Sequence, residues 1–189
     1  VGDLEAGEEY LRQALEVKGN EAGDAEYRGR ICYLLGDYDT ALTELEKALE
    51  KGSTSANLYL AKIFDEMGDE TSAQEYYKTY IASVPTDSAA LNELGEMMME
   101  KGQFAEAVTY FELASKCPTI SNKRVLMHNL IVAYEYNGNF YKAWEVVQEY
   151  VKLFPDDAEA QREYIFLKNR QMEEEVSETE STETIEGTN

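Results

Sequence analysis

Basic residues, proline, cysteine and histidine are all scarce in this chain of 189 residues. It has 17 Lys and Arg against 38 Asp and Glu, a formal net charge of −21. That charge repels phosphate backbones and anionic membrane surfaces, so we expect neither nucleic-acid binding nor binding to such membranes. No apolar run reaches the roughly 18 residues of a membrane span, so no transmembrane segment is expected.

The shortage of histidine and cysteine removes several kinds of site. His128 is the one histidine and there are two cysteines, which is too few for a zinc cluster or a Cys-His nucleophile. Cys32 falls on the apolar face of a predicted helix and is interpreted as core, and Cys117 falls in a distant loop. The glycines fall singly rather than in a phosphate-binding loop. We therefore predict no cofactor, no metal and no catalytic residue, and we interpret the many carboxylates as a solvated surface, with a buried acid pair left open.

The sequence does contain a repeat that begins with glycine. The glycines stand at positions 2, 36, 68, 102 and 138, which gives intervals of 34, 32, 34 and 36 residues. A polar residue usually follows, then an aromatic, as in Gly36-Asp37-Tyr38 and Gly138-Asn139-Phe140. Five residues after each glycine stands a small residue: Gly7, Ala41, Ala73, Ala107 and Ala143. A period of this length is typical of one supersecondary unit stacked on copies of itself.

Each unit is predicted to be two amphipathic helices joined at the glycine, for example Ala56–Met67 and Thr71–Val84. Pro85 then ends the second helix, as Pro118 and Pro155 do in later units, and Gly52 takes that place in the first full unit. We expect Gly29, Ala61 and Gly95 on first helices to face Ala41, Ala73 and Ala107 on second helices, because close crossings need small residues.

The two ends of the repeat differ from its middle. The first unit has only a second helix, Asp3–Lys18. After the last unit, Asp156 or Asp157 is expected to cap a final helix, Ala158–Arg170, whose Tyr164, Ile165 and Leu167 pack back on the preceding unit. Glu159, Arg162, Glu163 and Asn169 of that helix are expected to face water. The acidic, Ser/Thr/Glu-rich tail, residues 171–189, is expected to be disordered.

The segments GDYDTALTELEKALEKG, GDETSAQEYYKTYIASVP, GQFAEAVTYFELASKCP and GNFYKAWEVVQEYVKLFP resemble the tetratricopeptide repeat family, and the resemblance covers about residues 1–157. It implies an all-α, right-handed superhelical solenoid of antiparallel helix pairs: a half-repeat, four full repeats and a C-terminal capping helix, over residues 1–170. It also implies a concave groove lined by the first helices, which binds a protein or peptide without catalysis.

Alignment of the repeats gives the residues expected on the open side of each first helix. They are Glu26, Arg30, Tyr33, Leu58, Lys62, Asp65, Asn92, Glu96, Met99, His128, Val132, Glu135 and Tyr136. Some members of the family hold a peptide's terminal carboxylate with Lys, Asn and Arg, but Glu26, Arg30, Tyr59 and Glu93 stand in the equivalent places here. Apolar steps flanked by acids predict a partner with basic and apolar character.

A second interpretation concerns assembly rather than a groove. The exposed face of the half-repeat is available to pack on an upstream segment or on a second copy. Packing on a second copy would make the protein a homo-oligomer.

The sequence leaves two cellular compartments open: the cytoplasm and, if an upstream signal was removed, the bacterial cell surface as a lipoprotein. Because the chain starts with Val1 inside a repeat, we expect the natural protein to extend further upstream or to have been processed there.

Overall fold

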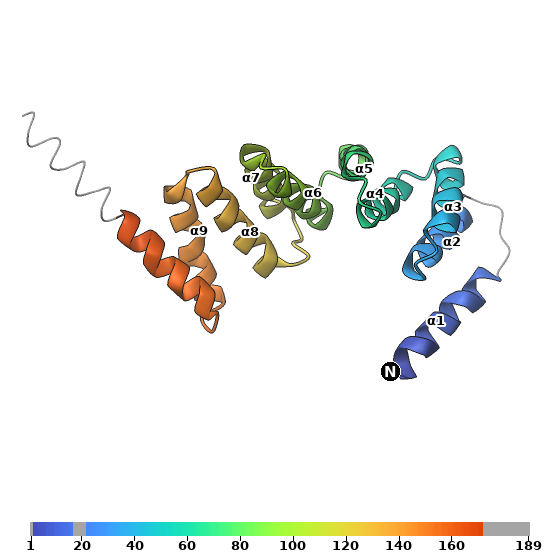
Figure 1. The fold of residues 1–189 in the computed structure, drawn as a ribbon, viewed down its shortest axis with the longest axis horizontal. Helices are drawn as coiled ribbons and strands as arrows, with labels where there is room; N and C mark the ends of the chain where they lie inside the picture. The colour runs from blue at the N-terminus through green and yellow to red at the C-terminus, as the bar shows by residue number, and fades with distance from the viewer. Residues whose placement is uncertain (1, 17–21, 172–189) are drawn as a thin grey trace, which may run out of the picture. The chain divides into compact units, whose positions relative to one another are not determined.

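The computed structural model describes residues 2–16 and 22–171, and every regular element within these ranges is an α-helix (Figure 1). The labelled helices are α1 (Gly2–Leu15), α2 (Ala22–Leu34), α3 (Tyr38–Glu50), α4 (Ala56–Glu66), α5 (Glu70–Ser83), α6 (Ser88–Glu100), α7 (Phe104–Ser115), α8 (Lys123–Tyr136) and α9 (Phe140–Leu153). A further helix spans 158–171. The predicted all-α helical repeat solenoid is confirmed. The expected disorder of the acidic tail concerns residues that lie, from 172 onward, outside the described ranges.

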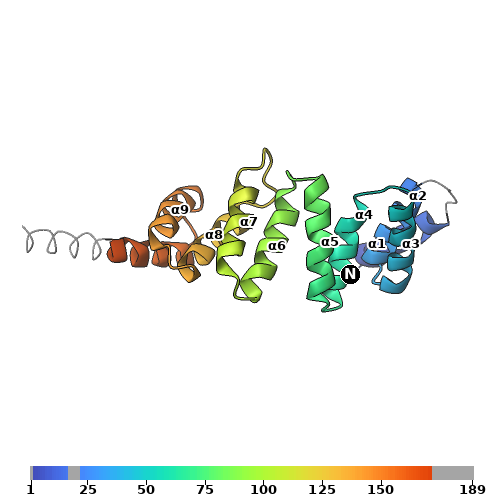
Figure 2. The same ribbon diagram turned by 90° about the horizontal axis from the view of Figure 1, so that it is seen from above.

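The helices form two compact units, divided after Pro85. The N-terminal unit holds α1 to α5, where α2 packs on α3, α4 packs on α5, and both α2 and α3 contact α4. The C-terminal unit holds α6 to α9 and helix 158–171, where α6 packs on α7, α8 packs on α9, and both α6 and α7 contact α8. Figure 2 shows α6 and α7 side by side, as their packing requires. This is the consecutive pairing that the repeat predicts.

A three-residue turn joins the helices of each pair, and its chemistry explains the glycine motif. Gly36, the turn glycine of the first pair, has φ +74°, a left-handed conformation that glycine adopts without steric cost. The N–H of Asp37 then donates to the carbonyl of Cys32, which closes α2. The carboxylate of Asp37 accepts from the N–H of Thr40, which caps α3. One polar residue after the glycine therefore ends one helix and begins the next.

Small residues let the helices of each pair pack closely. The four alanines on the second helices are fully buried: Ala41, Ala73, Ala107 and Ala143. We expected the glycines on the first helices to face these alanines, but their nearest neighbours are other side chains. A Cβ at Gly29 would lie 2.5 Å from Cγ of Leu45, and one at Gly95 would lie 2.5 Å from Cε1 of Phe111. Each glycine thus makes room for a large buried side chain one helical turn beyond the alanine.

Helix 158–171 is capped at its start and packs on α9 further along. Asp157 accepts hydrogen bonds from the N–H groups of Glu159 and Ala160, so the expected N-cap is confirmed at this residue. Further along, Leu167 is fully buried, and the ring of Tyr164 lies 4.9 Å from that of Trp144 on α9. The predicted packing of Ile165 is wrong, because this side chain is 56% exposed. Ile165 follows Tyr164 directly, and successive residues differ by about 100° around a helix.

Candidate functional site

On the N-terminal unit, two predicted residues of α2 belong to an aromatic cluster. The guanidinium of Arg30 lies 4.8 Å from the centre of the Tyr59 ring. The ring of Tyr33 stacks on that of Tyr38 and meets that of Tyr59 edge-on, both at 6.1 Å between centroids. These residues come from α2, α3 and α4, so the cluster joins two helix pairs. Its aromatic faces are a suitable surface for cationic or apolar groups.

Glu26 is held by donors of its own chain. Its Oε2 accepts hydrogen bonds from the hydroxyls of Ser53, at 2.6 Å, and Ser55, at 2.7 Å. Its Oε1 lies 3.8 Å from Nη1 of Arg30. The carboxylate therefore ties α2 to the connection between α3 and α4. On α4, the three predicted residues differ in exposure: Leu58 and Lys62 are half-buried and Asp65 is exposed.

In the C-terminal unit, the predicted Asn92 and Glu96 of α6 form a polar network with α8. The amide of Asn129 donates to Oδ1 of Asn92, at 3.1 Å, and to Oε1 of Glu96, at 2.6 Å. Asn92 itself donates to the same Glu96 oxygen at 3.0 Å. Asn129 was not among the predicted residues, although it directly follows His128. Asn92 and Glu96 also line a cavity of about 210 Å³ between α6 and the start of α8.

Two carboxyl groups meet where α8 faces helix 158–171. Glu135 on α8 shares a hydrogen bond with Glu163 on the final helix. Burial first, and then this hydrogen bond and the charge of Glu163, raise the pKa of Glu135 from 4.5 to about 8. The Oε1 atom of Glu135 is buried and has no hydrogen-bond partner among the described residues. The prediction that Glu163 faces water is therefore wrong, because the final helix packs with this residue against Glu135.

An open hollow of about 470 Å³ lies beside this acid pair. Glu135 and Glu163 line it together with the rings of Tyr136, Phe140 and Phe166. Tyr136 is 65% exposed and Phe166 is 52% exposed, so both rings present much of their surface to the solvent. Sequence reasoning selected Glu135 and Tyr136 but not the three residues from α9 and the final helix.

The exposed Tyr136 is nevertheless held in place. Its ring stacks on that of Phe104, the first residue of α7, with 4.9 Å between centroids. The stacking fixes an exposed aromatic ring at the end of α8, which lowers the entropy cost of using it to bind another molecule.

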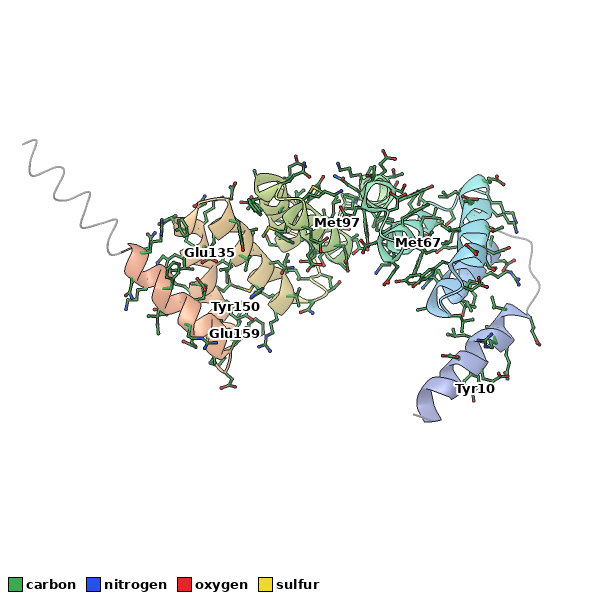
Figure 3. All side chains as sticks on the ribbon, in the orientation of Figure 1. Tyr10, Met67, Met97, Glu135, Tyr150 and Glu159 are labelled. Carbon is green, nitrogen blue, oxygen red and sulfur yellow. The ribbon has the colours of Figure 1, made fainter. Side chains whose placement is uncertain are left out.

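A second pocket, of about 190 Å³, lies further along the same face and is also lined by Glu135 and Glu163. The predicted His128 and Val132 of α8 line it, and so does Glu159 of the final helix. Figure 3 labels Glu135 and Glu159 on this part of the C-terminal unit. His128 is exposed and Val132 is half-buried. The structure thus brings together the four predicted residues of α8 along two adjoining hollows.

Other predicted side chains have a packing role. Met97 and Met98 are buried while Met99 is half-buried, so two of these three methionines belong to the core. Cys32 is 2% exposed, and burial raises the pKa of its thiol, as suits a core residue. Cys117 follows the end of α7, and both cysteines are free thiols.

Within residues 2–16 and 22–171, no group of three or more His, Cys, Asp or Glu side chains is arranged to hold a metal ion. In the same ranges, the helices are all too short or too polar to cross a membrane.

Comparison with known proteins identifies the repeat. A tetratricopeptide repeat family model matches residues 1–56 and 58–119, which together make up more than half of the chain. The chain belongs to the tetratricopeptide repeat family. Members of this family are generally non-enzymatic scaffolds that bind other proteins. A comparison with curated protein sequences gave no match.

Several solved tetratricopeptide repeat structures share the fold. The C-terminal part of a repeat-containing protein from Cytophaga hutchinsonii is 21% identical with a TM-score of 0.70, over 91% of this chain and 68% of that one. PilF of Pseudomonas aeruginosa is 22% identical with a TM-score of 0.62, over 88% and 72%. YrrB, described as having an unusual peptide-binding site, is 21% identical with a TM-score of 0.60, over 85% and 83%.

Proposed function

We propose that this tetratricopeptide repeat protein is an interaction scaffold that binds an extended peptide or protein segment along the open side of its first helices. The observation that carries the proposal is Tyr136, a ring that is 65% exposed and yet held by stacking on Phe104. Exposed, preorganised aromatic rings are typical of residues that dominate binding energy. YrrB, with its described peptide-binding site, supports the same class of function by likeness of fold.

The chemistry of the first helices favours a partner with basic and apolar side chains. In the N-terminal unit, Tyr33 and Tyr59 offer aromatic surface for apolar side chains, while Arg30 covers one face of Tyr59. In the C-terminal unit, the carboxyl group of Glu135 and the aromatic ring of Tyr136 line the same hollow. The net charge of −21 attracts basic segments from a distance and speeds their arrival. We expect the rings to supply affinity and the charges to supply rate and selectivity.

A peptide array probed with the full chain tests the proposal. Tyr33→Ala and Tyr136→Ala should each weaken binding of captured peptides by about tenfold, because truncating a central aromatic costs 1 kcal/mol or more. Tyr141→Ala is the matched control, since Tyr141 is 58% exposed but lies on a second helix, α9. Acidic ligands, or ligands that bind both variants as well as the parent, would contradict the proposed surface.

We also propose that the protein has no catalytic activity and does not bind nucleic acid. The family is generally non-enzymatic, and a net charge of −21 opposes contact with phosphates. A hydrolase substrate screen and a gel-shift assay at low salt should both be blank. Turnover in the screen, or a retarded nucleic-acid band, would require another function.

A second function, self-assembly through the N-terminal half-repeat, is favoured by the surface of α1. Tyr10 on this helix is 73% exposed, and every residue from 7 to 16 is exposed or half-buried. Contact with the rest of the unit includes a hydrogen bond from Nη1 of Arg28 to the carbonyl of Leu15. Light scattering after size-exclusion chromatography distinguishes the two functions. A stable dimer that Tyr10→Asp disrupts would favour assembly, and a monomer would favour the groove.

A further inference from the structure

The acid pair between α8 and helix 158–171 is costly as it stands. Two carboxyl groups, Glu135 and Glu163, share one hydrogen bond, and the buried Oε1 of Glu135 is unpaired among the described residues. An unsatisfied buried oxygen is unfavourable unless it gains a donor. The charged groups near the pair are Glu159, a third acid, and Arg170, whose guanidinium stacks on Phe140, so three carboxyl groups stand near one cation.

Aromatic faces stand next to these acceptors. Tyr136, Phe140 and Phe166 line the same 470 Å³ hollow as the two carboxyl groups. The guanidinium of Arg170 already covers one face of the Phe140 ring, at 3.6 Å from its centre, while Tyr136 and Phe166 are 65% and 52% exposed and remain open to a bound group. The hollow therefore combines acceptors for a donor group with ring faces on which a flat cation stacks.

We propose that this hollow is the subsite for an arginine side chain of the bound peptide. The planar guanidinium can donate to both carboxylates while it stacks on a ring, which the tetrahedral ammonium of lysine cannot do. The inference rests on the proposed peptide-binding function and names the side chain that this part of the surface selects. We call the hollow, defined by Glu135, Tyr136, Phe140, Glu163 and Phe166, the acidic aromatic cage.

Binding of arginine to the cage should also change the protonation of the two carboxyl groups. Near neutral pH the raised pKa of Glu135 keeps a proton on the pair, so the empty cage carries about one negative charge. A bound guanidinium favours loss of that proton. Binding should therefore release a proton and strengthen as the pH rises from 6 to 8.5. Other titratable or charged groups of the neighbouring helices are His128 on α8, Tyr150 on α9, and Glu159 and Arg170 on the final helix.

The test uses the full chain, labelled with ¹⁵N, and the peptide acetyl-Ala-Leu-Arg-Leu-Ala-amide. The control peptide replaces arginine with citrulline, which keeps the shape and removes the charge. The arginine peptide should shift the backbone signals of Glu135, Tyr136 and residues 163–167, and bind at least about tenfold more tightly than the citrulline peptide. A lysine version should bind with intermediate affinity.

A matched pair of variants tests the carboxylates. Glu135→Gln combined with Glu163→Gln should weaken the arginine peptide by about tenfold or more and remove the pH dependence of its affinity. Glu100→Gln is the control, because it replaces the same kind of carboxylate on an exposed residue at the end of α6. It should alter the affinity for the arginine peptide less than twofold. Thermal melts of the variants check folding, and the double variant should be at least as stable as the parent, because it removes a repulsive pair.

The outcomes separate the cage from the general function. Equal binding of the arginine and citrulline peptides, shifts confined to other residues, or an unchanged double variant would each show the cage assignment to be wrong. If array ligands bind well and survive the double substitution, the cage fails and the scaffold function stands. If no peptide perturbs the spectrum and the array is blank as well, both proposals fail.

Discussion

Single residues of this protein carry constraints that depend on what lies opposite them. Gly29 and Gly23 both belong to α2, yet a Cβ at Gly29 would lie 2.5 Å from the buried Leu45 and one at Gly23 would meet nothing within 4 Å. We predict that Gly29→Ala destabilises the fold by about 1–3 kcal/mol, because Leu45 must leave its position. Urea denaturation followed by circular dichroism measures the change.

Gly23→Ala is the control within the same helix. It should be neutral or stabilising by up to about 1 kcal/mol, because alanine reduces the entropy of the unfolded chain and prefers the helix. Equal effects of the two substitutions would mean that the crossing near Leu45 has room to relax.

Glu135 makes stability depend on pH in a specific direction. Its pKa is raised to about 8 in the folded chain, so the folded state binds the proton more tightly than the unfolded state does. The stabilising effect of this proton is complete below about pH 4.5 and is lost as the pH rises through 8. We predict that Glu135→Gln removes this loss and gains on the order of 1 kcal/mol over the parent at pH 8.5, since the pair is partly solvated.

Urea midpoints of the parent and the variant at pH 5 and pH 8.5 check this prediction. The difference between the two proteins should grow with pH. A difference that is constant, or that shrinks, would show that the carboxyl group of Glu135 is ionised at neutral pH.

At the scale of helices, Glu112 joins three elements of the C-terminal unit. From α7, it accepts hydrogen bonds from Lys142 on α9, at 2.9 Å, and from the hydroxyl of Tyr134 on α8, at 2.7 Å. These bonds, the one from Lys142 first, lower the pKa of Glu112 from 4.5 to about 2. The stabilisation from its charge is therefore present above about pH 4.5 and is lost as the pH falls toward 2.

We predict that Glu112→Gln destabilises the protein by about 1 kcal/mol at pH 7, a value kept small by partial solvation of the carboxylate. The difference from the parent should narrow between pH 4.5 and 3. Glu106→Gln, an exposed position one or two turns earlier on α7, provides the control for loss of charge alone. An equal loss of stability at both positions would show that the hydrogen bonds of Glu112 to α8 and α9 do not stabilise the fold.

The sequence predicts helices well here because the signals at their ends are local. The turn at Gly36 and Asp37 and the cap at Asp157 depend only on residues within a few positions of one another. The meeting of Glu135 with Glu163 depends instead on how helix 158–171 is rotated against α8, with α9 between them in the chain. Pattern alone could not choose between Ile165 and Glu163 as the inward residue, because packing of Tyr164 and Leu167 decides the rotation.

The candidate site was predictable in part for the same reason. Repeat alignment finds Glu135 and Tyr136, since every first helix presents equivalent positions. It cannot find Phe166, because the final helix has no counterpart in the repeat, nor Asn129, whose amide is directed by its contacts with α6. The stacking of Phe104 on Tyr136 likewise joins different repeats and leaves no trace in the pattern of either.

For the whole molecule, the dominant property is a net charge of −21. We predict that association of a basic peptide slows by about tenfold between 50 and 500 mM NaCl, while dissociation changes much less, because salt screens long-range attraction. Stopped-flow or surface-based kinetics with the arginine peptide measures both rates. The association rate of the citrulline peptide should depend little on salt. An equal salt dependence for both peptides would show that the charge of the protein does not speed the arrival of the arginine peptide.

The contact between Trp144 and Tyr164 gives the protein a natural optical reporter. Trp144 is the one tryptophan of the chain, and its indole lies 4.9 Å from a ring of the final helix, the same helix that supplies Glu163 and Phe166. Its fluorescence therefore reports attachment of that helix without any label. Emission that changes before the circular dichroism signal during denaturation would reveal the final helix leaving first, and with it Glu163 and Phe166 from the lining of the acidic aromatic cage.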